Sequence, residues 1–177
     1  FPPPGTPVRV YALASPFAPP DAVRERGAAV VTYPDIRWGR CDLKTVNLLP
    51  NVLAKQAAAE AGAFEGIFVR DGVVTEGAQT TVFVVRDGAL HTHPLSERIL
   101  PSVTREVVLE LAAELSIPAV EAAPSLDALR GADEAFLAST TADVMPVVAV
   151  DGATIGSGAP GAVTRRLAAA IAARLGR

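Results

Sequence analysis

The sequence predicts an α+β fold, in which short strands joined as hairpins are mixed with helices. Asp-Gly pairs at residues 71–72, 87–88 and 151–152 adjoin apolar, β-branched runs, and such pairs favour tight hairpin turns. Segments with helical periodicity lie between these clusters of strands. This order favours an α+β fold over a doubly wound parallel sheet.

The beginning of the chain is expected to be a linker followed by a strand. Phe1–Pro7 is rich in proline and has the composition of a linker. The loose alternation of apolar residues over Val8–Ala14 predicts a first strand. We therefore expect residues 1–14 to form a linker plus that strand, and residues 15–177 to form the main domain.

The main domain is expected to open with a helix, a strand and a longer helix. Asp21–Arg26 predicts a short helix or a turn that ends at a glycine, and the β-branched run Ala28–Tyr33 predicts a strand. Thr45–Ala61 has helical periodicity and is followed by a glycine. Pro50 lies near the start of this helix, where proline is tolerated.

The rest of the chain predicts short strands and two further amphipathic helices. We expect helices over Val103–Leu115 and Ala162–Leu175, with a helical turn over Leu126–Arg130. The strands are expected over Gly66–Arg70, Thr80–Arg86, Ala89–His93, Ala119–Ala122 and Glu134–Ala138, and a hairpin over Val147–Val150 and Ala153–Ile155.

Composition excludes several classes of protein. Half of the 177 residues are hydrophobic and a fifth are charged, which is typical of one globular domain with a core. The net charge is −3 and the basic residues are scattered, so a nucleic-acid partner is not expected. The sequence has no uncharged apolar stretch of about 18 residues, so no membrane-spanning helix is expected. The first residues do not resemble a signal peptide. The single cysteine, Cys41, favours a reducing, cytoplasmic setting.

Lysine is rare in this chain, and that rarity directs attention to two amines. Of the 16 basic residues only Lys44 and Lys55 are lysines. A desolvated lysine can form a Schiff base at neutral pH, whereas arginine cannot. Lys55 lies within the predicted helix, where a solvated lysine is the ordinary interpretation. Lys44 lies between a predicted strand and a predicted helix, and is either a surface lysine in a charged loop or a reactive amine.

Two further segments could bind an anionic or aromatic ligand. Glu76 stands at a joint between predicted strands and is followed by small polar residues; it is either part of a polar turn or a carboxylate that holds a protonated ring nitrogen. The predicted helix that starts near Ser102 could bind a phosphate through free N–H groups, or Ser102 and Thr104 could simply cap it.

Two weaker candidates complete the search for functional side chains. Hydroxyl residues at Ser139-Thr140-Thr141 follow a predicted strand directly and could join a phosphate site or end the strand. His91 and His93 share one face of a strand, but no carboxylate or third histidine lies at ligand spacing, so we expect no metal site.

Four ordered motifs resemble the class IV (fold-type IV) aminotransferases, which depend on pyridoxal 5'-phosphate. They are R-W-G-R-C-D-L-K-T-V-N-L-L-P-N-V-L-A-K-Q, R-D-G-V-V-T-E-G, I-L-P-S-V-T-R and F-L-A-S-T-T-A-D-V-M-P-V. The similarity runs from about Tyr33 to the C-terminus and is greatest to D-amino acid (D-alanine) aminotransferases. It implies the large cofactor-binding domain of that fold, a mixed, barrel-like sheet with flanking helices, over residues 15–177.

The resemblance implies a role for each part of the candidate site. Lys44 would bind the cofactor covalently and move the substrate proton. For this its amine has to be partly deprotonated near neutral pH, which burial and a cationic neighbour such as Arg37 would promote. Glu76 would pair with the pyridine nitrogen, and Arg37 would lie near the pyridine hydroxyl. The remaining implied contacts are with the ring and the phosphate and come from Leu100, Val103, Thr104, Ser139 and Thr140.

The resemblance also implies partners and leaves alternatives open. The substrates would be a D-amino acid such as D-alanine and a 2-oxo acid such as 2-oxoglutarate, and the protein would be a homodimer. Family members carry an N-terminal domain of roughly a hundred residues, and the resemblance implies that this sequence starts at the interdomain linker, within residues 1–14. A branched-chain aminotransferase, an (R)-amine transaminase, an aminodeoxychorismate lyase and an inactive binding domain of the same fold stay open.

The motifs also depart from the family pattern at two points. Relatives commonly have E-G-S-S-S/T-N where this chain has Glu76-Gly77-Ala78-Gln79-Thr80-Thr81, and a glycine where this chain has Ser102. These departures bear on the fine contacts to a ligand and leave the lysine motif unchanged.

Overall fold

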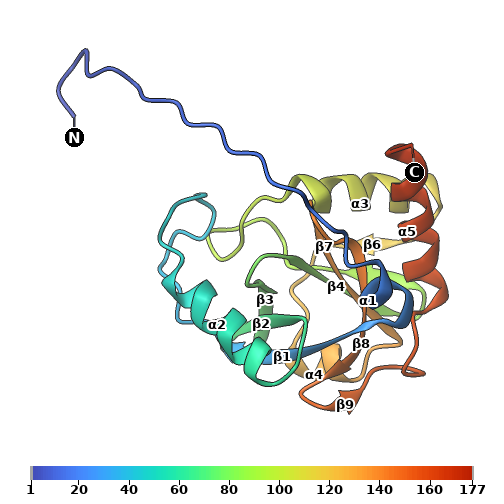
Figure 1. Ribbon diagram of the computed structural model, residues 1–177. Coiled ribbons are helices and arrows are strands. Elements are labelled where there is room, and N and C mark those ends of the chain that lie inside the picture. The colour runs from blue at the N-terminus through green and yellow to red at the C-terminus, as the bar shows by residue number, and fades with distance from the viewer. Residues whose placement is uncertain (1, 177) are drawn as a thin grey trace.

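The computed structural model describes residues 2–176 and has one mixed sheet with five helices around it (Figure 1). The helices among these residues are α1 Asp21–Arg26, α2 Leu49–Glu60, α3 Val103–Glu114, α4 Leu126–Arg130 and α5 Ala162–Arg174. The strands are β1 Ala28–Pro34, β2 Glu65–Arg70, β3 Val73–Gly77, β4 Thr81–Arg86, β5 Ala89–His91, β6 Ala119–Val120, β7 Glu134–Ser139, β8 Asp143–Val150 and β9 Ala153–Thr154. Phe1 of the expected linker and Arg177 of the expected main domain lie outside the described residues.

The sheet curls into a half-barrel. Its strands follow the order β3-β2-β1-β8-β7-β4-β5-β6, and β9 pairs with β8. β1 lies parallel to both β2 and β8, whereas the β2–β3, β7–β8 and β4–β7 pairs are antiparallel. A tight turn joins β3 directly to β4, although four strands separate them in the sheet order, so the sheet has to curl to bring the two together. The expected α+β fold with a barrel-like mixed sheet is confirmed.

Apolar side chains fill both faces of the curled sheet. One cluster packs inside the curve and includes Ile67, Val82, Leu137 and Met145, all at most 2% exposed. A second cluster lies on the other face, where α3 and α5 cover β4, β7 and β8 (Figure 1). Both faces are therefore buried over the middle of the sheet, which leaves its ends for polar residues.

Helix α2 packs closely on β2, and a glycine makes that approach possible. A Cβ atom at Gly66 would lie 2.7 Å from the Ala54 carbonyl oxygen. Ala54 and Ala58 are fully buried on the helix face that meets the sheet. The small residues on both elements thus fix the distance of α2 from the sheet.

One expected strand is absent from the structure, and the long helix begins later than expected. The strand predicted over Val8–Ala14 does not form, because no described strand pairs with this exposed segment; β propensity without a partner does not make a strand. The long helix begins at Leu49 instead of Thr45. With a start at Thr45, Pro50 would lie in the helix interior and its ring would clash with the carbonyl of Val46.

One strand was not expected at all, and another is longer than expected. The segment that the sequence presented as a polar joint forms β3, which includes Glu76 and Gly77. β8 begins at Asp143 rather than Val147, with Pro146 inside it.

No helix among residues 2–176 is long and apolar enough to cross a membrane.

Candidate active site

A cavity of about 770 Å³ opens where several elements begin or end. The end of β3, the starts of β4 and α3, the end of β7 and the segment that follows β1 all contribute to its wall. The lining residues that matter for its chemistry are Arg37, Cys41, Lys44, Asn51, Glu76, Ala78, Gln79, Thr80, Leu100, Ser102, Val103, Ser139 and Thr140. Seven of the eight candidate site residues named from the sequence therefore line one cavity, and Thr104 is the exception.

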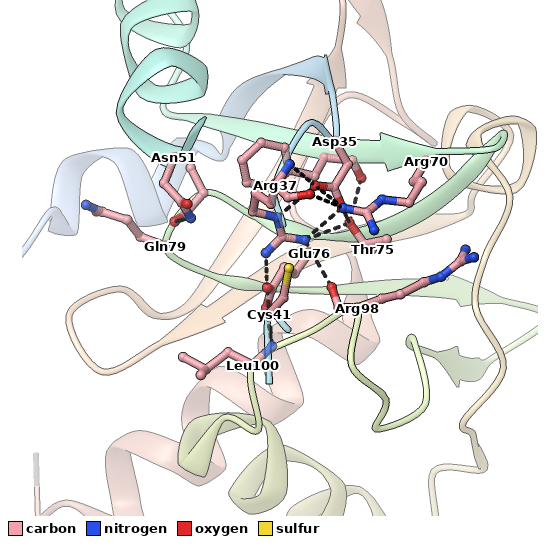
Figure 2. Close-up of polar contacts among 12 residues, drawn as sticks. Asp35, Arg37, Cys41, Asn51, Arg70, Thr75, Glu76, Gln79, Arg98 and Leu100 are labelled. Atoms are coloured by element: carbon pink, nitrogen blue, oxygen red, sulfur yellow. Dashed lines mark hydrogen bonds and ion pairs between the residues drawn. The ribbon is translucent and has the colours of Figure 1, made fainter. Parts of the chain in front are cut away.

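Glu76 lies at the end of β3 and is held from two sides (Figure 2). Its Oε1 pairs with Nη1 of Arg37, and both carboxylate oxygens accept from the backbone N–H of Leu100, at 3.2 and 3.1 Å. Glu76 is buried, and this burial raises the pKa of its carboxyl, although the Arg37 charge and the Leu100 N–H oppose that rise. The carboxylate thus sits at the cavity wall in a fixed orientation.

Arg37 follows β1 and its guanidinium is almost fully engaged. Beyond the pair with Glu76, Nη2 donates to the Arg98 carbonyl at 3.0 Å and to Thr75 Oγ1 at 3.2 Å. The guanidinium also lies 4.4 Å from the centre of the Phe68 ring. Although burial opposes its charge, the neighbouring carboxylates raise the pKa of Arg37, so this residue stays cationic.

Asp35 closes the network behind Arg37. Its Oδ1 and Oδ2 each lie 2.9 Å from a nitrogen of the Arg37 guanidinium, which makes a bidentate pair. Thr75 Oγ1 donates to Oδ2 at 2.9 Å, and Nη2 of Arg70 lies 3.0 Å from Oδ1. Burial would raise the pKa of Asp35, but the Arg37 and Thr75 contacts outweigh it and hold that pKa below its usual value.

The two lysines of the chain occupy different settings. Lys44 lines the cavity in the irregular segment between β1 and α2. Lys55 lies on α2, where its Nζ donates to the Phe64 carbonyl at 2.8 Å and pairs with buried Glu65 at 3.4 Å. Lys55 is not among the residues that line the cavity. Of these two amines, only Lys44 can reach a ligand there.

Lys44 is exposed, whereas burial was expected for it. Residues 43–49 are all exposed, so this segment stands clear of the sheet. The positive charge of Arg37 is also shared between two carboxylates, Asp35 and Glu76. Neither burial nor an unpaired cationic neighbour acts on the Lys44 amine in this structure.

The start of α3 offers donors for an anion. Ser102 caps this helix, since its Oγ accepts from the Arg105 N–H at 3.2 Å. The first N–H groups of a helix have no partner within the helix, and its dipole favours negative charge there. Val103 lines the cavity, and Ser139 and Thr140 face the same space from the end of β7. The capping and the anion-binding interpretations of this helix start are therefore compatible.

The turn between β3 and β4 presents a hydroxyl without a partner. Thr80 is buried, and its Oγ1 makes no hydrogen bond with any described residue. The Glu65 carboxylate on β2 accepts from the Gln79 N–H in this turn at 3.2 Å, and from the Gly66 N–H at 3.0 Å. Glu65 therefore connects the turn to β2. A Cβ atom at Gly77 would overlap Thr80 Oγ1, so glycine is required there.

The lining residues fit pyridoxal 5'-phosphate. An amine, a carboxylate and a helix start with hydroxyl neighbours are the groups that would bind its aldehyde, its ring nitrogen and its phosphate. The unpartnered Thr80 hydroxyl is a further donor or acceptor that a bound ligand could satisfy. The volume lies within the range of small-molecule sites, about 300–1,000 Å³. No group of three or more His, Cys, Asp or Glu side chains suited to a metal occurs among residues 2–176.

Sequence reasoning missed the residues behind the cavity wall. Asp35 and Thr75 were not named as candidates, yet both contact the Arg37 guanidinium. Asn51 was missed as well, and its Nδ2 donates to the Ala78 carbonyl at 2.7 Å. The sequence signal for Asp35 was a charged residue directly after a β-branched strand. In the structure its side chain is 0% exposed.

Comparison with known proteins gives consistent relatives. The family model for amino-transferase class IV matches residues 2–150. The D-alanine aminotransferase of Bacillus licheniformis is 45% identical over 163 residues, which cover 92% of this chain and 58% of that protein. The D-alanine aminotransferase of Staphylococcus haemolyticus is 42% identical, with 94% and 59% covered. The chain thus spans a little over half the length of these relatives.

Solved structures agree with the sequence relatives. The branched-chain amino acid aminotransferase of Thermobaculum terrenum, in its PLP-bound holo-form, superposes with a TM-score of 0.76 at 30% identity, over 85% of this chain and 52% of that one. The Thermoproteus uzoniensis branched-chain aminotransferase with norvaline gives 0.78 at 30% identity, over 89% and 54%. The chain belongs to the class IV aminotransferases, a family whose cofactor is pyridoxal 5'-phosphate.

Proposed function

We propose that this chain is the cofactor-binding part, over residues 15–177, of an aminotransferase that exchanges the amino group of a D-amino acid, such as D-alanine, with a 2-oxo acid such as 2-oxoglutarate. The single observation that carries the proposal is the cavity in which Lys44, Glu76 and the start of α3 meet. Bound pyridoxal phosphate supplies a ring that accepts the electron pair released at the substrate's α-carbon.

Lys44 has two tasks in this proposal. Its Nζ would hold the cofactor through the aldehyde carbon. Once released, the same amine would serve as the general base that takes up the proton of the substrate α-carbon and gives it back. A base in this role has to come within hydrogen-bond reach of that proton, and Lys44 lines the cavity on the irregular segment 43–48.

Glu76 and Arg37 would control the electronic state of the ring. A carboxylate opposite the pyridine nitrogen favours the protonated form by opposite charge at short range. Arg37 and the Leu100 N–H hold Glu76 in orientation, and Arg37 supplies the charge that offsets the cost of burying it. Leu100 itself lines the cavity and would pack beneath the ring.

The phosphate would be held by neutral donors of this chain. The N–H groups at the start of α3, at Val103 and Thr104, point along the helix axis toward an anion. Hydroxyls of Thr104, Ser139 and Thr140 would add direct contacts. These donors fix the position of the phosphate and hence the position of the ring over Leu100.

The preference for D-amino acids is supported by the identity of 40–45% to proteins named D-alanine aminotransferase. A branched-chain L-amino acid activity is the second candidate, because the superposed structures carry that name. Single-turnover spectra decide between them. The intact protein, loaded with pyridoxal phosphate, should lose the absorbance of the lysine-bound cofactor with D-alanine and keep it with L-leucine; the reverse would assign the second candidate.

We further propose a cytoplasmic homodimer. The support for a dimer is an exposed apolar surface on and before α2, where Val46 is 98% exposed, Leu49 67% and Val52 58%. Such a contiguous apolar surface marks an interaction site. A cytoplasmic setting is supported by the single cysteine, Cys41, which lies buried as a free thiol next to the cavity.

A further inference from the structure

A buried carboxylate, that of Asp35, lies outside the cavity and behind the arginine at its wall. Asp35 does not line the cavity, and its side chain is 0% exposed. Every hydrogen-bond and ion-pair partner of this carboxylate among the described residues is a donor: the Arg37 backbone N–H at 3.2 Å, the Arg37 guanidinium, the Thr75 hydroxyl and the Arg70 guanidinium. An ionised, fully paired Asp35 is therefore a permanent negative charge behind Arg37.

The geometry of Arg37 follows from this pairing. Asp35 takes Nε and Nη2 in a bidentate fork, which leaves Nη1 for Glu76. Bidentate pairs of this kind fix orientation as well as charge. Arg37 therefore stands between two carboxylates, one buried and one at the cavity wall (Figure 2).

The charge balance shows what Asp35 does for Glu76. Two arginines, Arg37 and Arg70, face two carboxylates, Asp35 and Glu76, so the charges of the four side chains cancel. Without the Asp35 charge, the remaining three side chains would carry one net positive charge. That charge would repel a protonated ring nitrogen placed beside Glu76. Arg37 alone would neutralise Glu76, and the attraction of Glu76 for a second cation would be lost.

We propose that Asp35 is a positioning residue that offsets the charge of Arg37, so that Glu76 keeps its attraction for a protonated ring nitrogen in the cavity. This inference rests on the proposed function for its ligand. The other groups that face Glu76 are the Leu100 N–H and the Cys41 thiol. The thiol lies within the electrostatic influence of the same two arginines and two carboxylates. Lys44 lines the same cavity.

The test replaces the charge and keeps the shape. Asp35→Asn retains an oxygen that can accept from Arg37 and removes the negative charge. The intact protein is loaded with pyridoxal phosphate labelled with ¹⁵N in the ring, and the nitrogen signal is followed against pH. In Asp35→Asn the midpoint for protonation of the ring nitrogen should move down by about one pH unit or more, the scale of a nearby-charge effect.

Asp151→Asn is the matched control. Asp151 also accepts from an arginine and a threonine, Arg130 and Thr32, but it contacts neither Arg37 nor Glu76. This control should keep the wild-type midpoint. An unchanged midpoint in a folded Asp35→Asn protein would overturn the proposal.

Two further measurements keep the outcome decisive. If Asp35→Asn does not fold, Arg70→Gln removes one of the two positive charges that Asp35 and Glu76 balance, so the midpoint should move up; no movement overturns the proposal. If the wild-type protein binds no cofactor, the proposed function fails separately. The ¹³C-labelled Glu76 carboxyl of the free protein then decides: its titration midpoint should fall in Asp35→Asn, and a constant midpoint contradicts the role of Asp35.

Discussion

Glu76 is a buried carboxylate on which burial and the neighbouring charge and donor act in opposite directions. Burial raises the pKa of this carboxyl, and Arg37 and the Leu100 N–H work against that rise. A carboxylate held this way can meet a cation in the cavity without moving first. Such preorganised electrostatic contacts are often the largest single contribution to catalysis.

Glu76→Gln should therefore leave the cofactor bound and slow proton transfer. The substitution keeps the size of the side chain and an acceptor for Leu100, but removes the charge opposite the ring nitrogen. The loss should be on the order of a few kcal/mol in the transition state, comparable with other single electrostatic contacts. Single-turnover rates with D-alanine measure it, and a wild-type rate would remove Glu76 from the mechanism.

Glu65 provides a prediction about stability and pH. Burial raises the pKa of its carboxyl, and the contact with Lys55 only partly opposes this. Because the folded pKa lies above the unfolded one, wild-type stability falls as pH rises from the unfolded value through the folded value. Each unit between the two pKa values corresponds to about 1.4 kcal/mol.

The measurement compares Glu65→Gln with the wild type by urea unfolding at several pH values. The variant has no carboxyl to ionise, so its stability relative to the wild type should improve as pH rises from about 4. Glu60→Gln, at the exposed end of α2, serves as the comparison variant. A difference between Glu65→Gln and the wild type that stays constant with pH would show that Glu65 does not titrate as described.

At the level of single residues, the sequence could predict the lining of the cavity and not the support behind it. Lys44, Glu76 and Ser139 lie in motifs with local signals: a lone lysine at a joint, an acid before glycine, hydroxyls after a strand. Asp35 and Thr75 act through contacts between residues about 40 positions apart. No local pattern encodes such a pairing, since it depends on how the strands meet.

At the scale of elements, the contact of α2 with β2 sets the cavity wall. Asn51 on α2 donates to the Ala78 carbonyl in the turn that lines the cavity. Any movement of the helix away from the sheet would therefore also move that turn. The distance between the two elements depends on Gly66.

Gly66→Ala should destabilise the fold by about 1–3 kcal/mol, the usual range for overpacking. The added Cβ would press on the backbone oxygen of Ala54, which can yield only if α2 shifts. Thermal unfolding measures the loss, and Gly39→Ala is the control, because a Cβ there meets nothing within 4 Å. Equal stability of the two variants would show that α2 is not fixed by this contact.

The elements with strong local signals were predicted well, and those that depend on partners were not. α3 and α5 were expected within one residue of their bounds, because both have helical periodicity and Ser102 also caps α3. The Val8–Ala14 strand failed because a strand needs a neighbour. β3 was hidden because its polar residues, Thr75 and Glu76, face the interior network rather than solvent.

At the scale of the whole molecule, the exposed apolar surface on and before α2 is the feature that supports the proposed homodimer. A homodimer that buries this surface would also enclose the cavity side of Lys44, whose segment is exposed in the single chain. Exclusion of water strengthens electrostatic contacts inside a site. The proposed dimer and the proposed chemistry are therefore linked.

Val52→Glu should weaken the dimer of the intact protein by at least about tenfold in dissociation constant, since a charge would be placed in an apolar interface. Ala169→Glu, at an exposed position on α5, is the control and should keep the wild-type behaviour. Sedimentation equilibrium distinguishes the two. A monomeric wild type, or an unaltered Val52→Glu dimer, would place the subunit contact elsewhere.

The central claim is that this cavity holds pyridoxal phosphate on Lys44, and trapping with borohydride tests it most directly. Reduction of the loaded protein should fix the cofactor to one lysine, which mass spectrometry of the peptides identifies. We expect the adduct on Lys44, its loss in Lys44→Ala and its retention in Lys55→Ala, because the Lys55 amine is engaged with Phe64 and Glu65 away from the cavity. An adduct on Lys55, or one that survives Lys44→Ala, would contradict the account.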